Sequence, residues 1–267
     1  MAHEVVMLGT GNAFLPYGRY HSFAMIDKKH IIDCPPTALA SLRREGQSVS
    51  EIETIFITHV HGDHVFGFPF LLLERRYISD RANEKPLTVV AAPGVKARLK
   101  QLCDLAYPGS LEESFERIQW RESAAGQLGC GLTWDRFAVY HDESVDPYGY
   151  HFDKGKEGSF VHSGDSGPCD SLYEEIAQSS MTILEMGLPE WVDSDTHHKP
   201  SDVESIAMKN SDVEFIITHT YVDTPGSGRT PTVTDAYPNH PSNVNHAEDG
   251  LRVVREGSIW SVQKIEE

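Results

Sequence analysis

The chain has 267 residues, 39% of them apolar, and a formal net charge of −17. This composition can build a sizeable core. The sequence has no run of about twenty apolar residues that would span a membrane. The negative charge disfavours a nucleic-acid partner, because phosphate is bound mainly through Lys and Arg. We therefore expect a small-molecule substrate. The start lacks the features of a secretory signal and the four cysteines form no CxxC pair, which predicts a cytoplasmic protein with reduced thiols.

Strand-like and helix-like segments alternate along the chain. The predicted strands are short apolar runs and lie at residues 5–8, 22–26, 29–33, 52–58, 87–91, 132–140, 181–185, 214–219, 251–254 and 258–262. The predicted helices lie at residues 37–45, 68–78, 94–106, 171–178 and 201–208. The spacing of Ser201 and Glu204 in the last helix is that of a capping box.

Residues 58–64 (Thr-His-Val-His-Gly-Asp-His) place three histidines and a carboxylate directly after a strand-like run. His59 and His61 are two positions apart, so an extended segment points both rings to one side, and the glycine before Asp63 and His64 allows a sharp turn. Imidazole and carboxylate together suit zinc or a similar first-row metal. Because one tetrahedral ion needs only about four ligands, this density, with further histidines downstream, indicates two ions.

This segment resembles the H-x-H-x-D-H signature of the metallo-β-lactamase superfamily. The superfamily also expects a lone histidine after a later strand, an aspartate in an SGD turn and a last histidine after an apolar strand. These features occur in that order at Phe137–His141, Phe160–Ser166 and Phe215–His219. The resemblance implies an α/β fold, a four-layer αββα sandwich, which would cover both faces of the apolar strands. Because the ligand positions extend from residue 59 to residue 219, we expect one domain over residues 1–267.

The resemblance further implies a site for two divalent metal ions, with zinc favoured and manganese or iron as alternatives. The superfamily's ligand positions correspond to His59, His61 and His141 for the first ion, to Asp63, His64 and His219 for the second, and to Asp165 between them. Such a pair would hold one bridging hydroxide and stabilise both oxygens of a displacement. Asp63 would also orient the attacking water or accept its proton.

Within the superfamily, the chain is most similar to the ribonuclease Z and phosphodiesterase branch. The similar segments are Leu8–Gly11 with Arg19 and Ser22, Ile32–Cys34 with Pro35 in place of a glycine, Ile183–Glu185, and Ala247–Gly250. In that branch a histidine before a capped helix protonates the leaving oxygen and a glutamate orients it. The resemblance assigns these catalytic roles to His198 and Glu185, with the adjacent His197 as the alternative match.

Ribonuclease Z carries a long arm that grips transfer RNA, inserted between the lone histidine and the bridging aspartate. Only 23 residues separate His141 from Asp165 here, which leaves no room for that arm. We therefore predict a phosphodiesterase that acts on a small phosphodiester or a cyclic nucleotide. Two alternatives stay open, namely a lactone, thioester or carboxylic ester hydrolase of the same fold, and a non-catalytic, metal-bearing regulatory module. A homodimer is compatible with this branch.

Residues 222–249 are rich in Pro, Gly, Asn and Thr and are too long for a simple connection. One interpretation is a lid over the metals, with Arg229 in contact with the substrate. The other is a surface or dimer loop.

Overall fold

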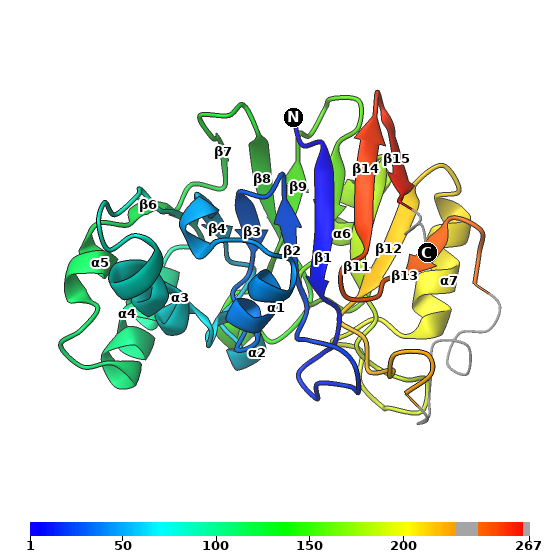
Figure 1. Ribbon diagram of the computed structural model, residues 1–267. Helices are drawn as coiled ribbons and strands as arrows, with labels where there is room; N and C mark the ends of the chain where they lie inside the picture. The colour runs from blue at the N-terminus through cyan, green and yellow to red at the C-terminus, as the bar shows by residue number, and fades with distance from the viewer. Residues whose placement is uncertain (228–239, 264–267) are drawn as a thin grey trace.

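The computed structural model describes residues 1–227 and 240–263 and contains two large β-sheets (Figure 1). The first sheet has eight strands in the order β15-β14-β1-β2-β3-β4-β5-β6. These strands are β1 Glu4–Gly9, β2 Phe23–Ile26, β3 His30–Ile32, β4 Thr54–Phe56, β5 Thr88–Val90, β6 Gln119–Arg121, β14 Arg252–Glu256 and β15 Ile259–Val262. The run from β3 to β6 is parallel, so the carboxyl ends of these strands lie at one edge of the sheet.

The second sheet has seven strands in the order β13-β12-β11-β10-β9-β8-β7. They are β7 Ala125–Gln127, β8 Thr133–Ala138, β9 Tyr148–Phe152, β10 Phe160–His162, β11 Met181–Glu185, β12 Glu214–Thr218 and β13 Val244–His246. The run from β10 to β13 is parallel. This sheet therefore also gathers several strand ends at one edge.

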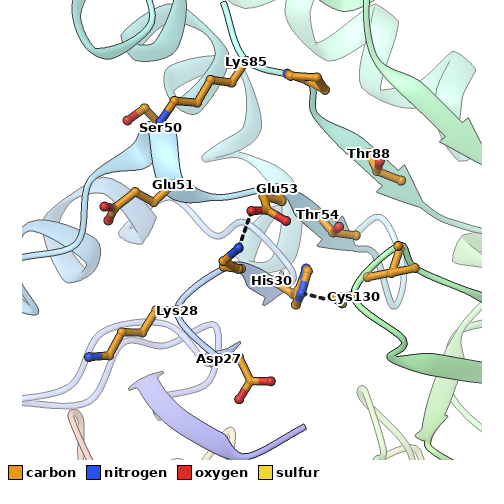
Figure 2. A pocket seen from close by; sticks show the side chains of 14 residues that line it. Asp27, Lys28, His30, Ser50, Glu51, Glu53, Thr54, Lys85, Thr88 and Cys130 are labelled. Carbon is orange, nitrogen blue, oxygen red and sulfur yellow. Dashed lines mark hydrogen bonds and ion pairs between the residues drawn. The ribbon is translucent and has the colours of Figure 1, made fainter. Parts of the chain in front are cut away.

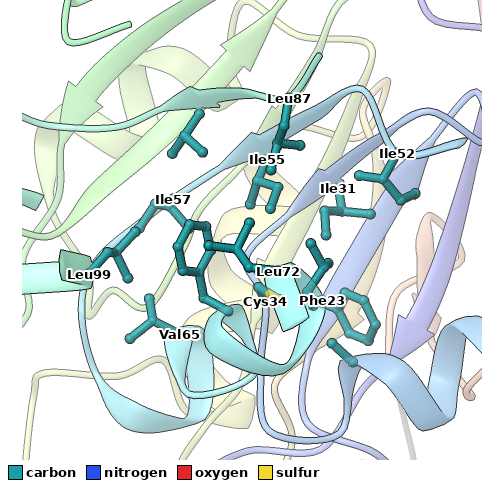
Figure 3. Close-up of a cluster of buried hydrophobic side chains, with 14 of the residues drawn as sticks. Phe23, Ile31, Cys34, Ile52, Ile55, Ile57, Val65, Leu72, Leu87 and Leu99 are labelled. Carbon is teal, nitrogen blue, oxygen red and sulfur yellow. The ribbon is translucent and has the colours of Figure 1, made fainter. Parts of the chain in front are cut away.

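Helices cover the outer face of each sheet (Figure 1). The first sheet is covered by α1 Ala38–Arg44, α3 Phe68–Glu74 and α4 Val95–Ala106, and the second by α6 Asp170–Ile176 and α7 Pro200–Lys209. Figure 3 shows the apolar cluster beneath the first set, which includes Phe23, Ile55 and Leu72. The predicted αββα sandwich is confirmed. Within the described residues no helix has the length and apolarity needed to cross a membrane.

The shorter helical segments connect these layers. They are α2 Gly62–Val65, α5 Glu112–Glu116, the π-helical turn Arg75–Ser79 and the 3₁₀ turns Val49–Glu51 and Glu143–Val145. The predicted helix over residues 68–78 therefore changes to π-helical geometry after Glu74. The four cysteines are unpaired.

Phe56 belongs to the apolar layer between the two sheets. Because side chains alternate along a strand, Ile55 of β4 faces the helices and Phe56 faces the opposite sheet. The Phe56 ring meets the rings of Trp134, Tyr150 and Phe152 edge-on, with centroids 5.8, 5.4 and 5.0 Å apart. Edge-to-face pairs of this kind add stabilisation beyond the area they bury, so one residue joins β4 to β8 and β9.

The predicted capping box at Ser201 and Glu204 is wrong by two positions. Helix α7 begins at Pro200, and the backbone N–H of Lys199 donates to the Asp202 carboxylate at 3.0 Å. Proline is favoured at the first helical position because its missing N–H has no helical partner there. The Ser201 hydroxyl instead donates to Glu190.

Replacing Phe56 by alanine should lower the free energy of unfolding by about 3–5 kcal/mol, because the buried ring is lost and a cavity remains. Urea unfolding of the metal-loaded protein, followed by circular dichroism, measures this. Phe14→Ala is the matched control, since that ring is 81% exposed and its loss should change stability by less than about 0.5 kcal/mol. Equal effects of the two substitutions would contradict the role given to Phe56.

Candidate metal centre

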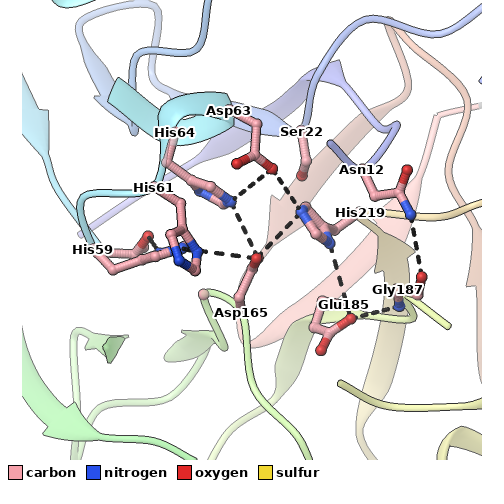
Figure 4. Close-up of polar contacts among 12 residues, drawn as sticks. Asn12, Ser22, His59, His61, Asp63, His64, Asp165, Glu185, Gly187 and His219 are labelled. Atoms are coloured by element: carbon pink, nitrogen blue, oxygen red, sulfur yellow. Dashed lines mark hydrogen bonds and ion pairs between the residues drawn. The ribbon is translucent and has the colours of Figure 1, made fainter. Parts of the chain in front are cut away.

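The seven predicted ligand residues come together at one edge of the sandwich. Figure 4 shows those around Asp165. His59 follows β4, His219 follows β12 and Asp165 follows β10, so three of them leave the carboxyl ends of strands in both sheets. His64 lies on α2, and His141 follows β8. Strand ends therefore carry ligands that are far apart in the sequence to one place.

One group of potential ligands contains His59, His61, His141 and Asp165. His61 Nδ1 lies 3.0 Å from His59 Nε2 and 3.2 Å from His141 Nε2. Asp165 Oδ2 lies 3.8 and 3.9 Å from the same two Nε2 atoms. These atoms surround a point that a single ion would fill.

The second group contains Asp63, His64, Asp165 and His219. His219 Nε2 lies 3.3 Å from both Asp63 Oδ2 and Asp165 Oδ2, and His64 Nε2 lies 3.3 Å from Asp165 Oδ1. For a tetrahedral ion with ligands at about 2.0–2.1 Å, neighbouring ligand atoms are separated by about 3.3 Å. The donor set and its spacing thus fit a zinc-like ion in each group, with one oxygen of Asp165 toward each of His64 and His219.

The outer nitrogen of each histidine in the first group has its own partner. His59 Nδ1 donates to Thr58 Oγ1 at 3.0 Å, and His141 Nδ1 donates to the Thr196 carbonyl at 3.0 Å. His61 Nε2 lies 3.4 Å from Asp142 Oδ2. These partners fix the tautomers, so the unprotonated nitrogens face the common point, as metal-bound histidines require.

Asp33 supports both groups from beneath. Its Oδ2 accepts from His64 Nδ1 at 2.8 Å and from the Thr58 hydroxyl at 2.7 Å, and Oδ1 accepts from the Thr58 backbone N–H. Asp33 has φ +68° and His219 has φ +49°. Left-handed backbone at non-glycine residues is uncommon and clusters at functional sites. Both residues therefore hold conformations that aim their side chains into the cluster.

The Asp165 carboxylate is 3% exposed, and burying a charge is costly unless opposite charge compensates it. Burial raises the pKa of Asp165, but the neighbouring His219 and His64 outweigh it and hold the pKa well below the usual range. Burial and His64 lower the pKa of His59 well below 6.5. An anionic carboxylate beside a neutral imidazole is the protonation state in which both bind a cation.

Glu185 is fully buried, and its carboxylate accepts from the backbone N–H groups of Ser166, Gly187 and His198. The Nδ1 of His197 donates to the same carboxylate at 3.0 Å. Burial lowers the pKa of His197, but the Glu185 carboxylate raises it more, to about 9. The pair is thus a cationic imidazole held by an anionic carboxylate.

The adjacent His197 and His198 rings have different surroundings. The His197 ring stacks on His219 at 5.6 Å and meets the edge of His141 at 4.7 Å. His198 is fully buried, and its ring is bonded to the Ser166 carbonyl at 2.6 Å and to the Tyr173 hydroxyl at 3.3 Å. Both ring nitrogens of His198 are thus engaged within the protein, and His197, the alternative match, is the histidine that lies against the two groups of ligands.

Gly187 makes room for this pair. A Cβ at residue 187 would lie 2.8 Å from His197 Nδ1 and 2.9 Å from Glu185 Oε2, which is closer than real Cβ atoms approach such groups. Asn12, from the turn after β1, donates through Nδ2 to the Gly187 carbonyl (Figure 4).

Sequence reasoning gave no role to Asp33, Asp142 or Thr196, each of which holds the outer nitrogen of a ligand histidine. Asp142 directly follows His141, and Asp33 directly follows β3, so both positions carried a signal. The stretch 222–249 is in part a strand, because β13 pairs in parallel with β12. Arg229, the predicted substrate contact, lies outside the described residues.

The sequence matches a family model described as anti-Pycsar protein Apyc1 over residues 3–223. A curated protein of that name from a Paenibacillus species is 40% identical over 94 residues, which cover 34% of this chain and 37% of that protein. A ribonuclease Z from Salinibacter ruber is 35% identical over 144 residues, which cover 52% of this chain and 42% of that enzyme. The matched region is thus less than half the length of either relative.

The fold is shared with a metallo-β-lactamase fold protein, YhfI, from Bacillus subtilis. The two structures superpose with a TM-score of 0.71 at 18% sequence identity, over 94% of this chain and 99% of that one. At this identity the likeness supports the fold.

Substitutions in the two ligand groups should separate the two ions. His141→Ala should leave about one ion per chain and His219→Ala should remove the other, because His141 belongs to the first of the two groups described above and His219 to the second. Asp165→Ala should weaken both. Inductively coupled plasma mass spectrometry of proteins dialysed against a weak chelator gives the stoichiometry.

The exposed His3 provides the control for these measurements, since His3→Ala should bind as much metal as the unsubstituted protein. The assignment would fail if His141→Ala and His219→Ala both retained the full metal content.

Proposed function

The chain belongs to the family of the anti-Pycsar protein Apyc1, within the ribonuclease Z and phosphodiesterase branch of the metallo-β-lactamase superfamily, and from that premise we propose that it is a metal-dependent phosphodiesterase. Its substrate is a small phosphodiester or a cyclic nucleotide, and its metals are two divalent ions, most simply zinc. The observation that carries this proposal is the Asp165 carboxylate between two groups of ligands, with the His197–Glu185 pair beside them.

When bound, two neighbouring divalent ions lower the pKa of water and stabilise the entering and leaving oxygens of a phosphoryl displacement. The proposal gives Asp63 a second role beside metal binding, as the acceptor or orienting partner of the attacking water. Its side chain is 14% exposed, so it borders the open side of the cluster. An ionised carboxylate is suited to that role, because hydrogen bonding from His219 and the charge of His64 together outweigh burial and lower the pKa of Asp63.

In this proposal His197 is the general acid. Its pKa of about 9 keeps the imidazole protonated at neutral pH, and its side chain is 18% exposed beside both groups of ligands. A protonated group that donates to the leaving oxygen accelerates the departure of a poor leaving group. Glu185 holds the ring through Nδ1, which leaves the Nε2 proton for the substrate.

The proposed substrate is small for two reasons. Only 23 residues connect His141 to Asp165, and they form a 3₁₀ turn and the strands β9 and β10, which leaves no arm for a transfer RNA. The net charge of −17 also disfavours a long polyanion. A small phosphodiester needs only local positive charge, which the ions and His197 supply.

Metal-loaded protein should hydrolyse bis-p-nitrophenyl phosphate and at least one cyclic nucleotide, and a chelator should abolish both activities. Asp63→Ala should lower kcat by a factor of about 10²–10⁴, because a positioned proton acceptor is lost. Asp104→Ala, an exposed acid paired with Lys100 on α4, should be unchanged. Cleavage of lactones or thioesters, with both phosphodiesters left intact, would replace this function with the carbonyl alternative. If the metal-loaded protein hydrolysed none of these substrates, the regulatory module would be the remaining alternative.

The leaving group should separate the roles of His197 and His198. His197→Ala should lower kcat for a cyclic nucleotide by about 10²-fold or more, yet affect bis-p-nitrophenyl phosphate far less, because nitrophenolate leaves without a proton. His198→Gln is the paired control and should show no such dependence on the leaving group, since the His198 ring is bonded to Ser166 and Tyr173. Equal losses on the two substrates for His197→Ala would remove it as the acid.

A further inference from the structure

A second cavity, of about 790 Å³, lies at the amino ends of β3, β4 and β5 (Figure 2). The metal cluster lies beyond the carboxyl end of β4, so the two sites are at opposite ends of the sandwich. The turn between β7 and β8, which contains Leu128 and Cys130, lines the cavity from the other sheet. A volume of this size is typical of small-molecule sites.

The floor of the cavity is a row of polar side chains across three parallel strands. His30 is paired in register with Thr54, and Thr54 with Thr88, and all three line the cavity. Two residues further along each strand, on the same face, Ile32, Phe56 and Val90 belong to the apolar layer between the sheets. The layer between the sheets thus changes from apolar to polar at the amino ends of these three strands.

These polar groups have unused hydrogen-bonding capacity. His30 is 2% exposed, and its Nδ1 has no partner among the described residues, while its Nε2 lies 3.5 Å from Cys130 Sγ. Within the same described part of the chain, neither the Thr54 nor the Thr88 hydroxyl is hydrogen-bonded to the protein. Valine would fill both threonine positions without leaving a hydroxyl to satisfy, so packing alone does not explain the row.

Some of the charged side chains at the rim have partners within the protein and others do not. Lys29 is paired with Glu53 at 2.7 Å, and the Glu51 carboxylate accepts from Gln47 at 2.8 Å. The ammonium groups of Lys28 and Lys85 form no ion pair with any described residue. Figure 2 shows Lys28 and Lys85 on opposite sides of Glu51 and Glu53.

The third acid at the rim, Asp27, is also engaged. Its Oδ1 accepts from the backbone N–H groups of His3 and Glu4 at 2.9 Å. The lining thus holds three lysines and three acids. The acids are hydrogen-bonded or ion-paired within the protein, whereas the ammonium groups of Lys28 and Lys85 have no carboxylate partner among the described residues.

We propose that this cavity is a second ligand site, distinct from the metal centre, for a small organic anion. Its phosphate or carboxylate group meets the ammonium groups of Lys28 and Lys85, and its hydroxyl or amide groups hydrogen-bond to His30, Thr54 and Thr88. The proposal does not depend on the reaction at the metal centre.

Titration calorimetry of the metal-loaded protein with glycerol 3-phosphate, gluconate and glycerol tests this site. Both anions should bind if the site recognises negative charge in either form. Binding of only one identifies phosphate or carboxylate as the group that the site prefers. Glycerol, which lacks charge, should not bind. The double substitution Thr54→Val with Thr88→Val should weaken anion binding by at least about tenfold while the melting temperature stays equal or rises, because valine suits the inter-sheet layer.

Charge and location are tested by three further variants. Lys85→Met should weaken anion binding, whereas Lys100→Met, an exposed lysine on α4, should not. Asp63→Ala should leave it unchanged, which separates this site from the metal centre. The proposal is overturned if neither anion binds, if glycerol binds as well as the anions, or if the threonine and Lys85 variants bind within twofold of the unsubstituted protein.

Discussion

The buried carboxylate of Asp165 is the group on which the arrangement of the site depends. It is nearly inaccessible, and His59, His64, His141 and His219 all approach it within 4 Å. A buried anion requires compensating positive charge. An imidazole that binds a metal ion is neutral, so the ligand histidines do not supply that charge when metal is bound. Two divalent cations, one in each group of ligands, would compensate it fully. The geometry of both sheets therefore gathers a buried anion and its histidine partners at a place that suits two cations.

The parallel strands explain why function gathers at the edges of the sandwich. Their carboxyl ends release His59, Asp165 and His219 into one cluster, while their amino ends present the row of His30, Thr54 and Thr88 to the opposite cavity. Between these ends the same strands contribute Phe56 and its neighbours to a closely packed layer. A rigid centre with polar ends holds both sets of side chains in fixed register, which preorganises them.

Most of the fold could be predicted from the sequence because strands that are apolar on both faces must be covered on both faces. Few arrangements of sheets and helices meet that condition. The seven potential ligands were identified because the segments that hold them follow strands, in the same order along the chain as in the superfamily. The ends of such strands are where these side chains meet. Elements without a strong pattern were missed, among them α5 and β13. The choice between His197 and His198 was not decidable from sequence, since adjacent residues before a helix point in different directions. Contacts such as Asp142 with His61 depend on loop conformation, which no local pattern encodes.

The most direct measurement is a crystal structure of the metal-loaded protein with anomalous scattering recorded at the metal edge. Two peaks about 4 Å apart are expected, with Asp165 in contact with both and His197 beside them. A single ion, or ions placed away from Asp165, would contradict the paired centre.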